Sequence, residues 1–434
     1  MYRIICISPH FPPRADSESF CGAKFTLELL KQGIELTVIC RDPTTPHPKP
    51  CDDSKLWLPL KEISLNIPTP VHKDRLRSAR LGFRYRTGNY ARWVRAVVDT
   101  AERLHCRNPY DLVYSRSLPM EAHIAGYWTS RRLKLPWIAN INDPWDWHLM
   151  PEGMRIEKSF LDRSISNYWM KKTLRAASLV TYPSDRLRDY HFRLCGVKHE
   201  SEIIPHVGYA HEKKKVGNNS GFLMVHAGKL GGLEARSPLA LLHGIEQFLK
   251  RKPGARSILR VVFVGQEDPF TRVKTDELGM QAIVEHTGRV SYERSLEFIS
   301  GASVCVLVEG TVPEGIFLAS KLVDYLAAGK PVLALSPANG VVADLSQKKG
   351  LLRVDTDDQN RVETAIAAYY QAYQSGCIED MSPTAELTGL FEPDAVTQIF
   401  MERLMKIMHK NASGVRLYRK KSPRPALDVQ TPVL

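Results

Sequence analysis

The sequence predicts an α/β protein of two domains, in which parallel strands alternate with connecting helices. Residues 1–42 read as a buried strand, a proline-containing loop, a helix and a second buried strand. Residues 303–335 repeat this order towards the other end of the chain. Strands that alternate with helices indicate crossover units and a parallel sheet. The length of 434 residues suits two domains of roughly 200 residues each.

Each element of the second unit has a local cause. The apolar run at residues 303–308 predicts a strand, and a loop that contains Gly and Pro follows it. Ser320 stands where a helix N-cap belongs. Gly329 and Pro331 mark the end of that helix, because glycine suits the position after the last turn and proline cannot continue it.

The start of this predicted helix is suited to an anion. It opens at the carboxyl end of a strand, where unpaired backbone N–H groups and the helix dipole attract phosphate. Lys321 opposes the dipole in the first turn, which indicates an anionic partner. Asp324 follows one turn later, placed to accept hydrogen bonds from a sugar diol. A buried crossover helix with a surface lysine and aspartate explains the same pattern, so the residues alone leave both interpretations open.

Residues 320–331 read Ser-Lys-Leu-Val-Asp-Tyr-Leu-Ala-Ala-Gly-Lys-Pro, and this segment resembles the donor-site motif of GT-B glycosyltransferases in the GT4-like (glycosyl transferases group 1) family. The resemblance implies a GT-B fold, with two Rossmann-like doubly wound domains facing each other across a cleft. It also implies that Asp324 holds the ribose of the donor. The first acidic position of the family motif falls on Ile316, which has no carboxylate. Glu314 and Glu309, in the same loop, are the candidates to replace it.

We expect the two domains to be followed by a helix and a tail. The N-terminal domain, which binds the acceptor in the family, is predicted over residues 1–210. The C-terminal domain, which binds the nucleotide sugar in the family, is predicted over residues 211–390. Residues 391–409 predict a terminal amphipathic helix that crosses back to the first domain. Residues 410–434 are polar and basic and predict a flexible tail.

The loop at residues 8–13 of the first domain is a candidate part of the acceptor site. The resemblance implies that it faces the acceptor cleft, which makes His10 and Arg14 candidate acceptor-binding residues; both could equally be ordinary loop residues. The helix that follows is expected to begin at Gly22, and no Gly-x-Gly-x-x-Gly fingerprint precedes it. In the family a small-residue loop here approaches the donor phosphates, and Gly22 is the residue that carries this role over.

Asp143 is a second candidate in the first domain. It follows the apolar strand predicted at residues 136–141, and open α/β sheets bind their ligands outside the carboxyl ends of strands. The carboxylate is therefore placed to contact a sugar hydroxyl or to act electrostatically, and the family has an Asp followed by a Trp at the end of such a strand. A turn-forming or N-cap role explains the same aspartate.

The second domain begins with an apolar strand and a Gly-rich loop that carries two basic residues. Basic side chains on such a loop suit a diphosphate, and the resemblance assigns the donor pyrophosphate to them. It also places the stretch 287–290 beside the nucleotide base. The candidate catalytic residues are Asp143, Lys229 and Lys321, and the candidate donor-binding residues are Gly22, Gly228, Arg236, Gly265, Arg289, Glu314, Ser320 and Asp324.

Two stretches of the first domain predict an irregular loop and a membrane-binding surface, respectively. Residues 43–70 hold many prolines and predict a long irregular loop. Residues 73–95 interleave basic and aromatic side chains, a mixture that suits the surface of an anionic membrane. An ordinary solvated helix–loop surface is the alternative.

Composition narrows the class of protein. The net charge of +13 suits an anionic partner, but no nucleic-acid-binding motif appears. The eight cysteines form no CxxC pair, which argues against a disulfide scaffold or a zinc site. No apolar run approaches the ~18 residues of a membrane span, and the N-terminus lacks the pattern of a signal peptide. We therefore expect a cytoplasmic protein, with attachment to the inner face of the membrane as an open alternative.

The resemblance implies transfer of a sugar from a UDP- or GDP-linked donor to a hydroxyl acceptor, with retention. It implies no metal and no cofactor other than the donor, which is a substrate. The implied acceptor is a saccharide or a lipid-linked saccharide, as in the synthesis of surface polysaccharides. Two alternatives stay open. One is a GT-B nucleotide-sugar 2-epimerase, and the other is a non-catalytic scaffold or binding partner, because Ile316 replaces an acidic residue.

Overall fold

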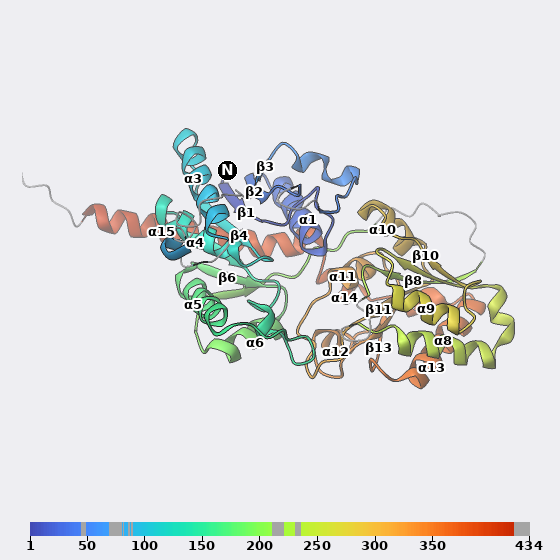
Figure 1. Ribbon diagram of the computed structural model, residues 1–434. Helices are drawn as coiled ribbons and strands as arrows, with labels where there is room; N and C mark the ends of the chain where they lie inside the picture. The colour runs from blue at the N-terminus through green and yellow to red at the C-terminus, as the bar shows by residue number, and fades with distance from the viewer. Residues whose placement is uncertain are drawn as a thin grey trace, which may run out of the picture.

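The computed structural model describes residues 1–44, 49–68, 80, 82–85, 87, 90–210, 221–230 and 236–420, the side chains of 412–420 excepted. Within these residues the strands form two sheets, and each pairing between neighbouring strands is parallel. Figure 1 shows the two sheets side by side, each with its helices around it. The α/β class and the two doubly wound sheets predicted from the sequence are thus confirmed.

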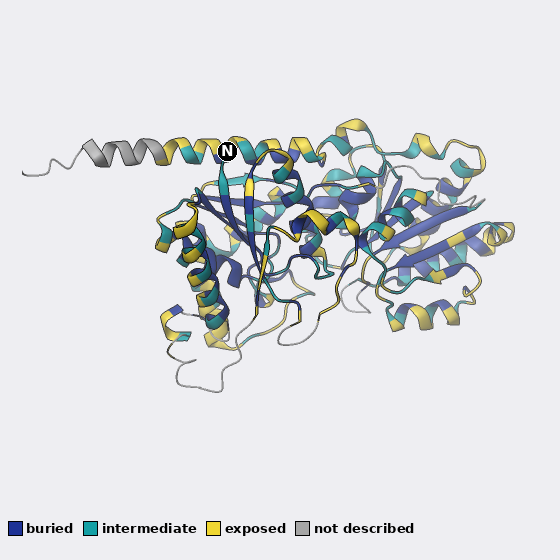
Figure 2. Ribbon diagram, turned by 90° about the horizontal axis from the view of Figure 1, so that it is seen from above, coloured by how far each residue is buried: buried dark blue, intermediate teal, exposed yellow. Residues whose placement is uncertain are grey.

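The first sheet has the strand order β3-β2-β1-β4-β5-β6-β7 and the second has the order β10-β9-β8-β11-β12-β13. Their strands read as near-continuous apolar runs, because helices cover both faces of a parallel sheet. Figure 2 shows these strands as buried and the outer faces of the helices as exposed. The strands are β1 (Arg3–Ile7), β2 (Glu35–Arg41), β3 (Ser64–Ile67), β4 (Leu112–Arg116), β5 (Trp137–Asn140), β6 (Leu179–Tyr182), β7 (Ser201–Ile203), β8 (Phe222–Ala227), β9 (Leu259–Val264), β10 (Val284–His286), β11 (Val304–Val308), β12 (Val332–Leu335) and β13 (Leu351–Val354).

The helices connect successive strands and cover the two sheets. The α-helices are α1 (Ser17–Lys31), α3 (Ala91–Arg107), α4 (Glu121–Leu133), α5 (Phe160–Ala176), α6 (Asp185–Cys195), α8 (Leu239–Arg251), α9 (Pro269–Glu277), α10 (Tyr292–Gly301), α11 (Ser320–Ala327), α12 (Val341–Leu345), α13 (Gln359–Gln374), α14 (Ala385–Gly389) and α15 (Pro393–Lys420). Short 3-10 helices are η1 (Lys55–Leu60), η2 (Trp147–Leu149), η3 (Pro253–Ser257) and η4 (Ile378–Met381).

Three local predictions need correction. Helix α1 begins at Ser17 rather than at Gly22, because the carboxylate of Asp16 accepts a hydrogen bond from the Ser19 backbone N–H at 2.9 Å and caps the helix. The stretch predicted as an irregular loop contains η1 and the edge strand β3. Helix α11 has Ala319 as its N-cap residue and no side-chain cap, so Ser320 is its first helical residue.

Helix α11 otherwise follows its predicted pattern. Leu322, Val323 and Leu326 are fully buried, and the helix ends at Ala327. Gly329 follows with a φ of 65°, a left-handed conformation that glycine adopts without steric cost. The prediction that Gly329 marks the end of the helix is therefore confirmed.

The two sheet domains are joined by a buried ion pair. Lys24 of α1 places its Nζ 2.6 Å from Oδ1 of Asp324 in α11, and the two side chains are 0% and 5% exposed. The Tyr292 hydroxyl donates to the other Asp324 oxygen at 2.9 Å, and the Tyr209 backbone N–H donates to the first at 3.1 Å. The Asp324 carboxylate thus accepts hydrogen bonds from three protein groups.

Helix α15 returns from the second domain to the first. Its Phe400 ring lies 5.3 Å from the rings of both Phe25 and Tyr114, and its Arg403 pairs with Glu200 and Glu202. Figure 1 shows this helix, in red, running behind the first domain. The helix continues to Lys420, beyond the end predicted at residue 409. Among the residues described, no helix is both long and apolar enough to cross a membrane.

Removing one member of the buried pair is expected to destabilise the protein strongly. Lys24→Ala or Asp324→Ala should each lower the free energy of unfolding by about 3–5 kcal/mol, because the remaining charge stays buried without a partner. Thermal and urea unfolding of the variants measure this loss.

The double variant Lys24→Met with Asp324→Asn should recover much of the stability, since it removes both charges and keeps an acceptor for the Tyr209 N–H. Arg272→Ala, which breaks the exposed Arg272–Glu267 pair, should have little effect and serves as the control. Single variants as stable as the parent protein would show that the pair does not hold the domains together.

Candidate active site

Charged side chains from the carboxyl ends of the two sheets act on one another. Burial raises the pKa of Asp143, which follows β5 in the first domain, and the charge of Arg236, which lies just before α8 in the second, opposes this rise. Burial also lowers the pKa of Lys321 and raises that of Glu309; Arg236 adds to the first shift and opposes the second. Arg236 therefore acts electrostatically on two other predicted residues, Asp143 and Lys321, which come from distant parts of the chain.

Lys321 occupies the first turn of α11 and lies against the loop that follows β8. Its Nζ is 3.3 Å from Nε2 of His226. Gly228 has a φ of +98°, and a Cβ added there would lie 3.0 Å from the Lys321 Nζ. A side chain at this position would be strained and would crowd the amine, so glycine is required. The neighbouring Gly265, with a φ of +129°, would bring an added Cβ to within 3.3 Å of Gly228.

The Lys321 amine is poised to gain a proton when an anion arrives. Burial, followed by the charge of Arg236, lowers the pKa of Lys321 to about 7, and Glu309 opposes the shift. Burial and Lys321 hold the pKa of His226 well below its usual range, so the imidazole is neutral. Its Nδ1 lies 3.0 Å from the Val306 carbonyl and must donate to it, which leaves Nε2 to accept from Lys321.

Glu309 presents an unsatisfied acceptor at the same place. It directly follows β11, and its Oε2 is buried with no hydrogen-bond partner among the described residues. Burial raises the pKa of Glu309 to about 7, although Ser336, Arg236 and Lys321 oppose the rise. A Cβ added at Gly315 would lie 3.7 Å from this oxygen. Buried oxygens are normally paired, so this one suits a ligand that brings a hydrogen-bond donor.

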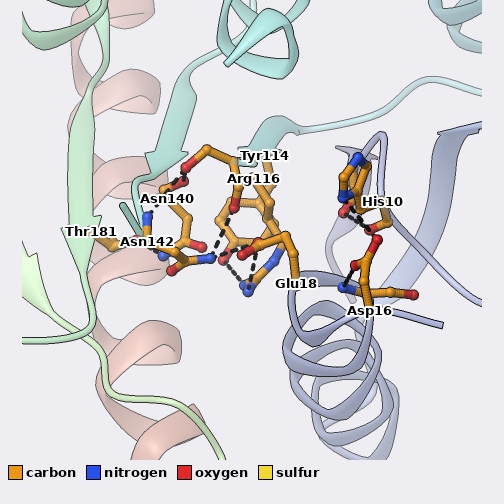
Figure 3. Close-up of polar contacts among 11 residues, drawn as sticks. His10, Asp16, Glu18, Tyr114, Arg116, Asn140, Asn142 and Thr181 are labelled. Carbon is orange, nitrogen blue, oxygen red and sulfur yellow. Dashed lines mark hydrogen bonds and ion pairs between the residues drawn. The ribbon is translucent and has the colours of Figure 1, made fainter. Parts of the chain in front are cut away.

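The first domain adds a buried polar cluster, drawn in Figure 3. Glu18, in the first turn of α1, accepts a hydrogen bond from Nδ2 of Asn142 at 2.7 Å and lies 4.0 Å from Nη2 of Arg116. Burial raises the pKa of Glu18 to about 8, and Asp143 also raises it. Burial raises the pKa of Asp143 itself to about 6. Oδ1 of Asn142 and Nε of Arg116 are buried without hydrogen-bond partners in the described structure.

The predicted acceptor residues His10 and Arg14 converge on one carboxylate. Nδ1 of His10 lies 3.1 Å from Oδ2 of Asp16, and Nε of Arg14 donates to the same oxygen. Burial tends to raise the pKa of Asp16, but His10, the Ser19 N–H and Arg14 lower it to about 2. These contacts hold the loop against the N-terminus of α1, and the acceptor role of both residues stays a prediction.

Three predicted donor residues have other partners in the structure. Asp324 accepts hydrogen bonds from Lys24, Tyr292 and Tyr209, and its role as the ribose ligand stays a prediction. Gly22 lies inside helix α1, where an added Cβ would be 3.5 Å from Nε of Arg116, rather than in a phosphate-binding turn.

Glu314 is the third. It pairs with Arg186 and Arg193 of α6 and so joins the two domains instead of facing a donor. Ile316, at the position where the family motif carries an acid, is fully buried and packs with the core of the first domain. The loop between β11 and α11 therefore joins the domains, and Glu309 is the acidic group of this loop on which Arg236 and Lys321 act.

The remaining candidates are accessible. Gly228 and Lys229 are exposed and Ser320 is partly exposed. Arg289 is exposed, and its Nη2 donates to Oε1 of Gln266 at 2.7 Å. Gly228 and Gly265 line a small cleft together with Phe263, Gln266, Glu267, Asp268, Thr271 and His286.

Sequence reasoning missed four residues of the site: Glu18, Arg116, Asn142 and His226. Arg116 and Asn142 lie at the carboxyl ends of β4 and β5, so strand ends are the signal that could have found them. Nothing in the sequence around His226, a strand residue, indicates its contact with Lys321. No cluster of three or more His, Cys, Asp or Glu side chains suited to a metal ion occurs in the described part of the chain.

Comparison with family models finds one match, which lies in the first domain. Residues 24–205 match the family model described as "Glycosyl transferase 4-like domain". This match covers most of the first domain. Comparison with curated protein sequences finds no significant match for the chain.

Solved structures resemble both domains of the chain in fold. HepE from Anabaena, solved in complex with UDP-glucose, superposes with a TM-score of 0.66 at 15% identity, covering 94% of this chain and 100% of that chain. Sucrose-phosphate synthase from Thermosynechococcus elongatus has a TM-score of 0.58 at 16% identity, covering 97% and 100%. A putative UDP-N-acetylglucosamine 2-epimerase from Listeria monocytogenes has a TM-score of 0.54 at 12% identity, covering 92% and 94%. The predicted GT-B fold and the resemblance to GT-B glycosyltransferases are confirmed.

The electrostatics predict that nucleoside diphosphate binds more weakly as pH rises. Lys321, with a pKa of about 7, is charged below that pH and neutral above it. Above this pH the amine must take up a proton from solvent when the diphosphate binds, so the affinity for the diphosphate should fall by up to about tenfold per pH unit. Glu309, also with a pKa of about 7, gains negative charge over the same range and acts in the same direction.

Calorimetric titration with UDP between about pH 7 and pH 9 measures this slope, above the phosphate ionisation near pH 6. Lys321→Met should bind UDP more weakly and with a shallower slope, and Glu309→Gln should also flatten it. A Lys321→Met slope equal to that of the parent protein would exclude Lys321 as a diphosphate ligand.

Proposed function

We propose that the protein transfers a glycosyl group from a nucleotide-sugar donor to the hydroxyl of an acceptor. The observation that carries the proposal is the buried Glu309 oxygen, which has no hydrogen-bond partner among the described residues and lies within the electrostatic reach of Lys321 and Arg236. Arg236 also acts on Asp143 of the first domain. Two cations suit a diphosphate, and a carboxylate oxygen without a partner suits a sugar hydroxyl. The complex of HepE with UDP-glucose, on the same fold, supports a UDP-linked donor.

Each of these residues has a proposed role. Lys321, Arg236 and the exposed Lys229 take up the charge of the leaving diphosphate, the largest electrostatic change of the reaction. Glu309 accepts hydrogen bonds from the donor sugar and replaces the acid missing at Ile316. Asp143 contacts the acceptor side of the reacting centre.

The proposed reaction breaks the bond between the anomeric carbon and the diphosphate oxygen and forms a bond to the acceptor oxygen. The acceptor proton passes to the departing diphosphate, so that charge and atoms balance. We propose retention of configuration, which is the outcome that this proton path on one face of the sugar requires. No metal ion has a part in the proposed reaction, because Lys321, Arg236 and Lys229 supply the positive charge.

We further propose a lipid-linked saccharide as the acceptor, at the inner face of a membrane in the cytoplasm, in the synthesis of a surface polysaccharide. The net charge of +13 supports contact with an anionic surface. Of the basic segment predicted to make this contact, residues 73–79, 81, 86, 88 and 89 lie outside the described residues.

The epimerase is the second candidate function, favoured by the 2-epimerase among the similar structures. A thermal-shift screen with UDP, GDP, ADP and CMP and their sugar conjugates identifies the donor first. Incubation of that donor without acceptor then separates the two functions. An epimerase converts it to an isomer, and a glycosyltransferase leaves it unchanged or slowly hydrolyses it. If no donor of the panel is either converted or used for transfer, the protein is a non-catalytic scaffold.

Substitutions in the cationic cluster should reduce turnover without unfolding the protein. Lys321→Ala is expected to lower kcat by about 100- to 1,000-fold, the range found when a group that stabilises transition-state charge is removed. Lys229→Ala should act in the same direction but less, because Lys229 is exposed. Donor hydrolysis or transfer and the Tm are measured together.

Lys250→Ala, which removes an exposed lysine paired with Glu246 at 2.7 Å, is the matched control and should leave turnover unchanged. If Lys321→Ala keeps the parent turnover at saturating donor, the assignment of the diphosphate site is wrong.

A further inference from the structure

The end of the first domain that faces away from the second sheet carries an apolar groove. Figure 1 shows α3, α4 and α5 together at this end. The groove has a volume of about 750 Å³, and its apolar lining comes from Phe83, Tyr127, Trp128, Ile165 and Tyr168. Phe83 is 88% exposed. A phenylalanine this exposed beside four other large apolar side chains is unfavourable in water, which indicates a surface that is covered in use.

Helix α5 extends this apolar surface. Its residues from Phe160 to Ile165 are all exposed, and Phe160 and Leu161 are 75% and 71% exposed. Leu161, Ile165 and Tyr168 follow one another at spacings of four and three residues, which places them on one face of the helix. The apolar stripe on this face therefore leads from the tip of the helix into the groove.

A second groove, of about 420 Å³, adjoins the first and is cationic. It shares Arg84 and Trp128 with the apolar groove and adds Arg95, Arg131 and Arg132, together with one acid, Asp99. Arg95 lies 3.3 Å from Asp99, and Arg132 lies 2.8 Å from Glu102. These are exposed pairs, which contribute little and exchange readily for another anion. Four arginines face two carboxylates, so the groove favours an anionic ligand.

We propose that the two grooves together hold an anionic membrane lipid, with its chain in the apolar groove and its phosphate in the cationic one. Arginine side chains recognise phosphate by paired hydrogen bonds, and the adjoining apolar surface removes a hydrocarbon chain from water. The end of the domain formed by α3, α4 and α5 thus rests on an anionic leaflet. A soluble anion would use only the cationic groove and would leave the apolar stripe unexplained.

This surface overlaps the one predicted over residues 73–95 and extends beyond it. Among the described residues of that stretch, Phe83 lines the apolar groove and Arg84, Tyr85 and Arg95 line the cationic one. The rest of the apolar part comes from α4 and α5. The proposal deepens the lipid-linked acceptor of the proposed function by naming where the protein meets the membrane. It is tested without donor or turnover, so its failure and that of the glycosyltransferase assignment are distinguishable.

Sedimentation of the full chain with vesicles tests the proposal. We expect binding to phosphatidylglycerol–phosphatidylcholine vesicles about tenfold or more tighter than to pure phosphatidylcholine vesicles, weakening as salt increases. Leu161→Asp with Ile165→Asp should abolish binding to both. Arg131→Gln with Arg132→Gln should remove the preference for the anionic vesicles.

Matched controls separate these effects from general changes of surface. Val273→Asp replaces a side chain of α9 that is 52% exposed, and Arg272→Gln removes an exposed arginine paired with Glu267; neither should change vesicle binding. Each variant should keep the parent Tm and the parent thermal shift with UDP, which shows that it is folded.

Three results would overturn the proposal: no binding to anionic vesicles, binding that both double variants leave unchanged, or release by inorganic phosphate alone with no effect of Leu161→Asp and Ile165→Asp. The last result would assign the cationic groove to a free anion instead of a lipid.

Discussion

A buried ion pair joins the two sheets and, together with the loop between β11 and α11, fixes their relative position. Lys24 and Asp324 are 300 residues apart in the sequence, and both are almost completely removed from water. Burying two charges is costly, so such a pair is maintained only where its geometry and remaining hydrogen bonds are satisfied. The Tyr292 hydroxyl and the Tyr209 backbone N–H complete the carboxylate. Separation of the domains would leave a lysine and an aspartate without their partners.

The same two helices carry the candidate active site, which is why the ion pair determines its geometry. Lys321 lies one turn before Asp324 in α11, and Glu18 lies near the start of the helix that carries Lys24. Fixing the two helices therefore brings their N-terminal turns to the same region. The charge of Arg236 in the second domain opposes the burial-driven rise in the pKa of Asp143 in the first and adds to the burial-driven fall in the pKa of Lys321, so charges of the two domains act on one another here.

The sequence predicted those structural features that depend on neighbouring residues. Strand runs, the end of α11 at Gly329 and the GT-B fold could be predicted, because each depends on neighbouring residues or on a motif. The start of α1 was also local, since Asp16 precedes a helical pattern as an N-cap should, and it was missed in favour of Gly22. Asp324 was different. Its partner Lys24 belongs to another domain, and no pattern around either residue indicates the other.

The loop between β11 and α11 lacks an acid at the position where the family motif has one, because Ile316 occupies it. Ile316 is fully buried in the core of the first domain, and its carbonyl accepts a hydrogen bond from the Ser184 hydroxyl at 3.2 Å. An acid at this position would be buried among apolar side chains at a large desolvation cost. Glu314 adds two ion pairs to the same contact. Because the loop joins the domains, the proposed function takes its carboxylate from the beginning of the loop, where Glu309 follows β11 with one oxygen that has no hydrogen-bond partner among the described residues.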